Sequence, residues 1–74
     1  MKKKKREVRA NLIKLRKAAG YTQEQFGKKL NVSTTHISDL ENRKSDPSFG
    51  FIEKLEKFCL SENIEIIDMW ELFK

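Results

Sequence analysis

The amino-acid sequence predicts an all-α fold, a compact five-helix bundle in one domain. Three observations lead to this prediction. The chain has 74 residues, which is room for one small core. Apolar residues recur three and four positions apart in successive short segments, which is the periodicity of helices and not of strands. Residues that start or stop helices stand between these segments.

The first two helices are predicted from their apolar spacing and their ends. The first carries four regularly spaced apolar residues: Val8, Leu12, Leu15 and Ala19. Gly20 follows as a C-terminal stop. Thr22 and Gln25 have the spacing of a capping box, so a second helix begins there. This helix carries Phe26, Gly27 and Leu30 and ends at Asn31, a residue type that tolerates a left-handed backbone.

The remaining three helices follow in the same way. Ser33 is a suitable N-cap for a third helix that runs to about Glu41. A polar loop over residues 42–46 separates it from a fourth helix, which begins at Pro47 and Ser48. The fourth helix is predicted to bury one apolar face: Phe49, Phe51, Ile52, Leu55, Phe58 and Cys59. The stretch from Asp68 to Glu71 indicates a short fifth helix that ends near residue 73.

The charge is distributed unevenly along the chain. Residues 1–30 hold eleven basic and two acidic residues, and residues 31–74 hold five and nine, which gives net charges of +9 and −4 and the total of +5. This asymmetry favours a polyanionic partner for the basic half. Residues 1–7 are predicted to form a basic N-terminal arm and residues 8–74 the folded domain. A solvated tail that aids solubility is the alternative for the arm taken alone.

Several classes of protein are not supported by the sequence. Cys59 is the only cysteine, so no intramolecular disulfide can form, and a lone Cys with a lone His does not indicate a metal site. No paired carboxylates, nucleophile–base pair or phosphate-binding glycine loop indicates an enzyme or a cofactor, and no small-molecule ligand is evident. No apolar run reaches the ~20 residues of a membrane span, and the N-terminus has no apolar core of a secretory signal. We therefore expect a cytoplasmic location.

The third helix is predicted to show a strip of short polar side chains. Successive helical residues turn by about 100°, so Ile37 and Leu40 define an inward face, and the polar side chains centre roughly opposite to it. They are Thr34, Thr35, Ser38 and Asp39, here called the reading strip. Short donors and acceptors of this kind suit base edges in the major groove of DNA, and Ser33 at the start of the helix is added to the predicted base-reading set. An ordinary solvated helix surface is the alternative.

The order of these parts resembles the helix-turn-helix of the Cro and phage-repressor type, the XRE family. The resemblance rests on a helix that begins TQEQ, the small residue Gly27, a three-residue turn, and a third helix that ends in Leu-Glu-Asn. It covers about residues 8–73 and implies double-stranded DNA as the partner. It also implies a pairing of Arg16 with Glu41 and a phosphate contact for Gln23, while Lys44, Pro47 and Ser48 match the stretch that leads into the fourth helix.

The chain departs from the family pattern at Arg43 and near its C-terminus. The family has Gly where Arg43 stands, so a left-handed backbone there would bring strain of about 1–2 kcal/mol. The other interpretation of Arg43 is a phosphate contact, beside two further predicted contacts, Asn42 and Lys44. For Arg43 and Lys44, solvated loop charges are the alternative. The last segment is unusually apolar, and four of its residues are predicted to form a homodimer interface: Ile66, Ile67, Trp70 and Phe73.

The function expected from these features is sequence-specific DNA binding. A transcriptional regulator of prokaryotic or phage origin, a repressor acting as a homodimer on a palindromic operator, is the leading interpretation, with location at the nucleoid. An antitoxin or a restriction-modification controller of the same fold is an alternative. A protein–protein adaptor and a membrane-surface module built on the basic N-terminal segment are alternatives of other classes.

Overall fold

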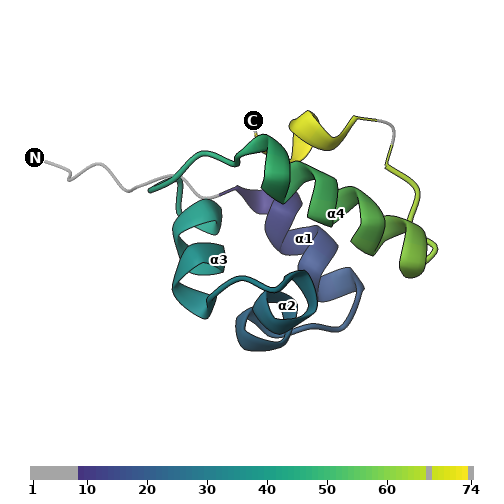
Figure 1. Cartoon of the computed structure of the whole chain (residues 1–74), viewed down its shortest axis with the longest axis horizontal. Helices are drawn as coiled ribbons and strands as arrows, with labels where there is room; N and C mark the ends of the chain where they lie inside the picture. Colours follow the sequence, from purple (N-terminus) through teal and green to yellow (C-terminus); the bar gives the residue numbers. More distant parts are fainter. Residues whose placement is uncertain (1–8, 67, 74) are drawn as a thin grey trace, which may run out of the picture.

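A computed structural model describes residues 9–66 and 68–73 of the chain. It contains four α-helices, α1 (Ala10–Ala18), α2 (Gln23–Leu30), α3 (Thr34–Glu41) and α4 (Phe49–Ser61), followed by the 3-10 helix η1 (Met69–Phe73) (Figure 1). No strand occurs in these ranges, so the all-α prediction is confirmed for them. None of the described helices is long and apolar enough to cross a membrane.

The prediction of five helices is wrong, because the last element is not an α-helix. The backbone N–H of Glu71 donates to the carbonyl of Asp68, three residues back, at 3.1 Å. The Asp68 carboxylate accepts from the backbone N–H of Trp70 at 3.0 Å. Bonds over three residues make a tighter helix that is stable only in short pieces, and η1 has five residues.

The boundaries of the first three helices agree with the capping residues in the sequence. The Thr22 hydroxyl accepts from the backbone N–H of Gln25 at 3.1 Å, and the Gln25 side chain accepts from that of Thr22 at 3.0 Å. Asn31 ends α2 with a φ of 60°, and Gly20 has a φ of 84° behind α1. The Ser33 hydroxyl caps α3 by accepting from the N–H of His36.

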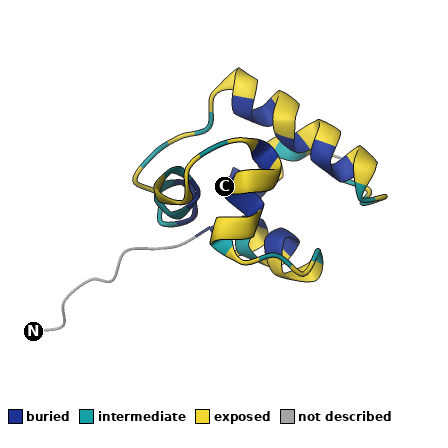
Figure 2. Cartoon of the chain, turned by 60° about the horizontal axis from the view of Figure 1, so that its bottom comes forward, coloured by how far each residue is buried: buried dark blue, intermediate teal, exposed yellow. Residues whose placement is uncertain are grey.

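The core draws on all four α-helices. Its five largest fully buried side chains are Leu12, Phe26, Ile37, Leu40 and Leu55. Figure 2 shows that each helix turns its buried face toward the others and leaves the opposite face exposed. The rings of Phe26 and Phe58 meet edge to face with their centroids 5.2 Å apart, which joins α2 to α4.

The prediction for Phe49 is wrong: its side chain is 80% exposed. Five of the six apolar residues predicted for the buried face of α4 are buried, among them Phe51 at 3% exposure. Two helical positions correspond to roughly 200° of rotation, so Phe49 and Phe51 cannot both face the core. Phe51 packs into the core, and Phe49, the first residue of α4, lies on the solvent-facing side of the helix.

Candidate nucleic-acid interface

The α3 helix is held by its apolar face and presents its polar face outward. Ile37 and Leu40 are both 0% exposed. On the other side, Thr34 and Thr35 are exposed, and Ser38 and Asp39 are half-buried. In Figure 1, α3 stands at one side of the molecule, apart from the C-terminal end of α4. The two Thr side chains are therefore the part of the reading strip that is most accessible to solvent.

The turn between α2 and α3 is closed too tightly for a side chain at Gly27. A Cβ atom built there lies 2.8 Å from the carbonyl oxygen of Val32 and 3.4 Å from that of Ser33. Both neighbours are backbone atoms, which cannot turn away as a flexible side chain could. The absence of a Cβ at Gly27 thus allows the close approach that sets the angle between the two helices.

A buried polar network ties the end of α3 to α1 and α2. Arg16 Nε donates to Glu41 Oε2 at 2.7 Å, and Gln23 Nε2 donates to Glu41 Oε1 at 2.8 Å. Arg16 also donates from Nη1 to the carbonyl of Tyr21 at 2.9 Å. The two charged side chains are only 11% and 3% exposed. The three side chains therefore fix the C-terminal end of α3 against the two preceding helices.

The predicted phosphate-contacting residues occupy different environments. The Gln23 amide is bonded to Glu41, and the Asn42 amide folds back on α3, where Nδ2 donates to the Ser38 carbonyl at 2.9 Å and lies 3.3 Å from its hydroxyl oxygen. Arg43 and Lys44 are exposed. Arg43 has a φ of 61°, so the left-handed backbone considered for this position is present. Two exposed cations therefore follow α3 just after its C-cap, Asn42.

Arg9 is a functional candidate that the sequence reasoning missed. Its side chain is 5% exposed, although it carries a charge, and its guanidinium donates to the Leu40 carbonyl at 3.0 Å. It is the N-cap of α1, three residues before Leu12 and seven before Arg16, a spacing that puts it on the same side as these two residues at the start of the helix. That spacing was the available signal, and the basic run before Arg9 concealed it.

The predicted dimer residues differ in how far the fold buries them. Phe73 is 8% exposed, packed with its ring centroid 6.2 Å from that of Phe51, so its surface is covered within its own chain. Trp70 is 42% exposed and meets Phe49 edge to face at 5.8 Å. Ile66 is half-buried. Ile67 and the basic arm lie outside the described residues.

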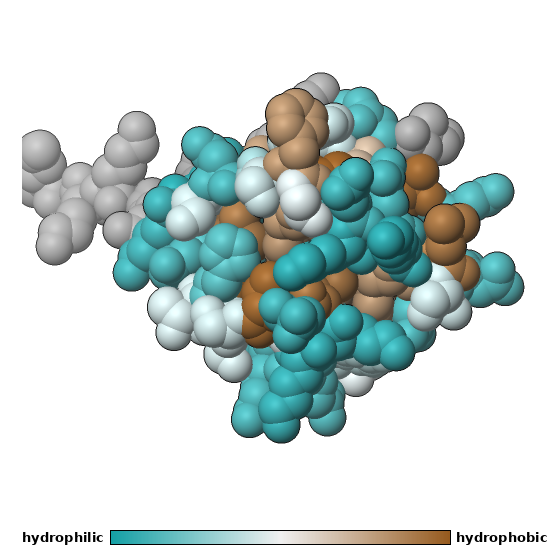
Figure 3. Space-filling model, in the orientation of Figure 1, coloured by the Kyte–Doolittle hydropathy of each residue, from teal (hydrophilic) through white to brown (hydrophobic). Residues whose placement is uncertain are grey.

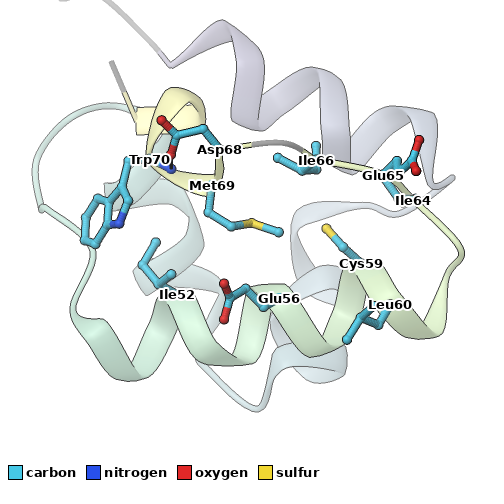
Figure 4. Close-up of a pocket in the computed structure, with 10 residues that line it drawn as sticks. All are labelled: Ile52, Glu56, Cys59, Leu60, Ile64, Glu65, Ile66, Asp68, Met69 and Trp70. Carbon is cyan, nitrogen blue, oxygen red and sulfur yellow. Dashed lines mark hydrogen bonds between the residues drawn. The ribbon is translucent and has the colours of Figure 1, made fainter.

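A hollow of about 550 Å³ lies beside Trp70, between α4 and the C-terminal segment. Figure 4 shows Cys59, Ile66 and Met69 around it, with Trp70 at one end and Leu60 at the other. Leu60, like Phe49, is 80% exposed. In Figure 3, apolar patches interrupt the polar surface over α4. The large apolar side chains left exposed in the described ranges thus gather on one face.

Two described side chains, Tyr21 and Cys59, have raised pKa values. The hydrogen bond from the Tyr21 hydroxyl to Glu62 raises the pKa of Tyr21, with smaller contributions from burial and from the charge of Glu62. Burial raises the pKa of the Cys59 thiol. Both shifts favour the neutral form, so the two groups are less ready to ionise than in water.

Comparison with known proteins gives one match. A model of the helix-turn-helix family matches residues 12–59, which include α2, the turn, α3 and most of α1 and α4. No curated protein and no solved structure matches the chain. The match covers more than half of the sequence, and it includes Gly27, the Arg16–Glu41 pair and the reading strip. The chain belongs to the helix-turn-helix family of the XRE type, a family of DNA-binding regulators.

Proposed function

We propose that the protein is a sequence-specific transcriptional regulator that inserts α3 into the major groove of DNA. The observation that carries this proposal is the way α3 is mounted. Its inner side is fixed by two fully buried apolar residues, and its outer side offers Thr34 and Thr35 to solvent. A helix that contacts bases with its outer face must be held rigidly at its inner face, because base edges are recognised through hydrogen bonds of defined direction.

The reading strip supplies the chemistry for base recognition. The Thr hydroxyls can donate or accept, and their methyl groups can contact a thymine methyl. Asp39 can accept from the exocyclic amine of cytosine. Ser33 and Ser38 are weaker candidates, because the Ser33 hydroxyl caps α3 and Ser38 contacts the Asn42 amide. Thr35 and Asp39 are therefore the residues we assign to base preference.

We assign contacts with the phosphate backbone of DNA to the N-terminal end of α2 and to the loop after α3. Lys44 is exposed, and its backbone N–H donates to the Asp39 carbonyl at 2.8 Å. This bond holds Lys44 at the end of the reading strip, where a cation meets a phosphate beside the groove. The Gln23 and Asn42 amides serve mainly to brace α3, and a contact to phosphate is secondary for both.

We further propose that two copies bind a palindromic operator and repress by occupying it. A two-fold pair covers an apolar patch with one self-complementary surface. Trp70, joined to the exposed Phe49 ring, is the anchor of this interface, and Ile66 lies beside it. Such a pair would present two α3 helices about 34–36 Å apart, one turn of B-DNA.

Selection of binding sites from random DNA tests the assignment. Thr35→Ala should weaken the preferred site by about 1–3 kcal/mol and relax the selected motif at particular bases. Ser61→Ala, which removes an exposed hydroxyl at the end of α4, is the control and should leave the motif unchanged. Lys44→Ala should weaken all duplexes alike, whereas Lys57→Ala on α4 should not. An unchanged motif with Thr35→Ala would show that Thr35 does not read bases.

A further inference from the structure

Arg9 connects the recognition helix to the loop that follows it. Its guanidinium donates from Nη1 to the Leu40 carbonyl at 3.0 Å and to the Ser45 carbonyl at 2.9 Å, and from Nη2 to the Asp46 carboxylate at 2.9 Å. The Arg9 backbone N–H donates to the Glu41 carbonyl at 2.8 Å. One residue thus holds the last turn of α3 and the far end of the loop over residues 42–46.

The surroundings of Arg9 are arranged poorly for stability alone. The Asp46 side chain is 93% exposed, and an ion pair with an exposed partner contributes little. Arg9 Nε is buried and finds no acceptor among the described residues. An apolar side chain in such a place is often as stable as a buried charge or more so. The guanidinium carbon lies over the Phe73 ring, 5.3 Å from its centroid, a cation–π contact that is modest in energy and that an apolar side chain would replace with ordinary packing.

The guanidinium is arranged well for fixing a geometry. It is a planar fork with bonds in set directions, which a Lys ammonium on its flexible stem cannot reproduce. Its acceptors lie at both ends of the loop, at residue 40 before it and at residues 45 and 46 at its far end. Between them stand Arg43 in its left-handed conformation and the exposed Lys44. Arg9 therefore sets where these two cations lie relative to the reading strip.

We infer that Arg9 is a positioning residue for DNA recognition, which fixes the distance between the base contacts of α3 and the phosphate contacts of the loop. This inference rests on the proposed function. With Arg9 in place, the loop can contact the phosphates of a duplex only when the reading strip is also aligned with the bases. Without it, the loop can hold phosphates while α3 is misaligned, so affinity for the preferred site falls and affinity for other DNA does not.

Arg9→Lys is the main test, because it keeps the charge and removes the fork. Binding is measured to the preferred duplex and to an unrelated duplex of equal length over a salt series, with urea unfolding as the check on folding. We expect affinity for the preferred duplex to fall about tenfold, which corresponds to one lost base contact, and that for the unrelated duplex to change less than twofold. The salt dependence should stay the same, since no charge is lost. Equal losses on both duplexes, or no loss on either, would overturn the inference.

Asp46→Asn is the second variant, and it perturbs only the exposed end of the contact. Removal of a negative charge near DNA should raise affinity for both duplexes, but the ratio between preferred and unrelated DNA should fall two- to threefold. Glu53→Gln, which removes an exposed carboxylate on α4, should leave the ratio unchanged. A ratio unchanged in Asp46→Asn as well would make Arg9 a structural residue only.

Amide hydrogen exchange separates the inference from the proposed function. The backbone N–H groups of Lys44 and Ser45 both donate to the Asp39 carbonyl, at 2.8 and 3.3 Å. In Arg9→Lys they should exchange faster than in the wild type without DNA, while those of α2 stay protected. A wild type that prefers no duplex would overturn the proposed function and this inference with it. A wild type with a preferred duplex and variants of undiminished ratio would overturn this inference alone.

Discussion

Replacement of Arg16 with Met should leave the buried Glu41 carboxylate without its charged partner. The Arg16 and Glu41 side chains are 11% and 3% exposed, and their closest atoms are 2.7 Å apart. Met has a similar length and no polar atom that can pair with a carboxylate. Glu41 would keep only the bond from Gln23, at 2.8 Å, as the side-chain contact seen here.

The expected loss in the free energy of unfolding is large compared with the stability of the whole domain. A buried pair broken on one side loses about 3–5 kcal/mol, and the remaining Gln23 bond places the expected value near the lower end, at about 3 kcal/mol. Folded domains are stable by roughly 0.05–0.15 kcal/mol per residue, or about 4–11 kcal/mol for a chain of this length. Arg16→Met should therefore remove about a quarter or more of the free energy of unfolding.

A double-mutant cycle measures the coupling between the two residues. Arg16→Met, Glu41→Leu and the double variant are unfolded in urea and followed by circular dichroism at 222 nm. The double variant should be more stable than Arg16→Met, because removal of both buried charges is often nearly neutral, and the coupling should reach about 2 kcal/mol. A loss below about 1 kcal/mol in Arg16→Met, with no coupling, would mean that the pair acts as an exposed ion pair and would refute the argument.

Three further outcomes follow from the structure. Gly27→Ala should lower the free energy of unfolding by about 1 kcal/mol, because overpacking against the Val32 carbonyl at 2.8 Å exceeds the gain in helix propensity of about 1 kcal/mol; a variant as stable as the wild type in urea would contradict this. The pKa of Tyr21 is higher in the folded protein than in the unfolded chain, where it is about 10, so the tyrosine contributes stability below that pH which is lost as the pH rises through the folded pKa. Tyr21→Phe should therefore lose less stability than the wild type between about pH 9 and 11. Equal losses would show that the Glu62 bond does not matter. Trp70→Ala should be a folded monomer in sedimentation with weakened operator binding, and a variant that still dimerises would remove Trp70 from the interface.

The features that the sequence predicts well are those decided within a few residues. The capping box of Thr22 and Gln25, the left-handed Asn31 and the Ser33 cap are side-chain or backbone choices made inside one turn. They place α2 and α3 without knowledge of the rest of the fold. The turn between these helices is predictable for the same reason.

The features that the sequence predicts poorly depend on distant partners. Phe49 and Phe51 both fit an apolar helix, and only the packing of α4 on the core decides that Phe51 is buried. The apolar C-terminal segment predicts Phe73 at a homodimer interface, but in the structure Phe51 and Arg9 of the same chain cover it. Arg9 looked like the end of a basic run because its acceptors stand 31 to 37 positions later in the chain.

The double fixation of α3 has a thermodynamic consequence for binding. The helix is capped by Ser33 at its start and held by Glu41 at its end, so its backbone entropy is already lost in the free protein. Association with DNA then requires no coil-to-helix transition in the recognition element. The heat-capacity change on binding should reflect the surface that α3 and the loop bury, without a folding contribution from the helix. DNA recognition by α3 then corresponds to the binding of a preformed helix, without the entropic cost of ordering it.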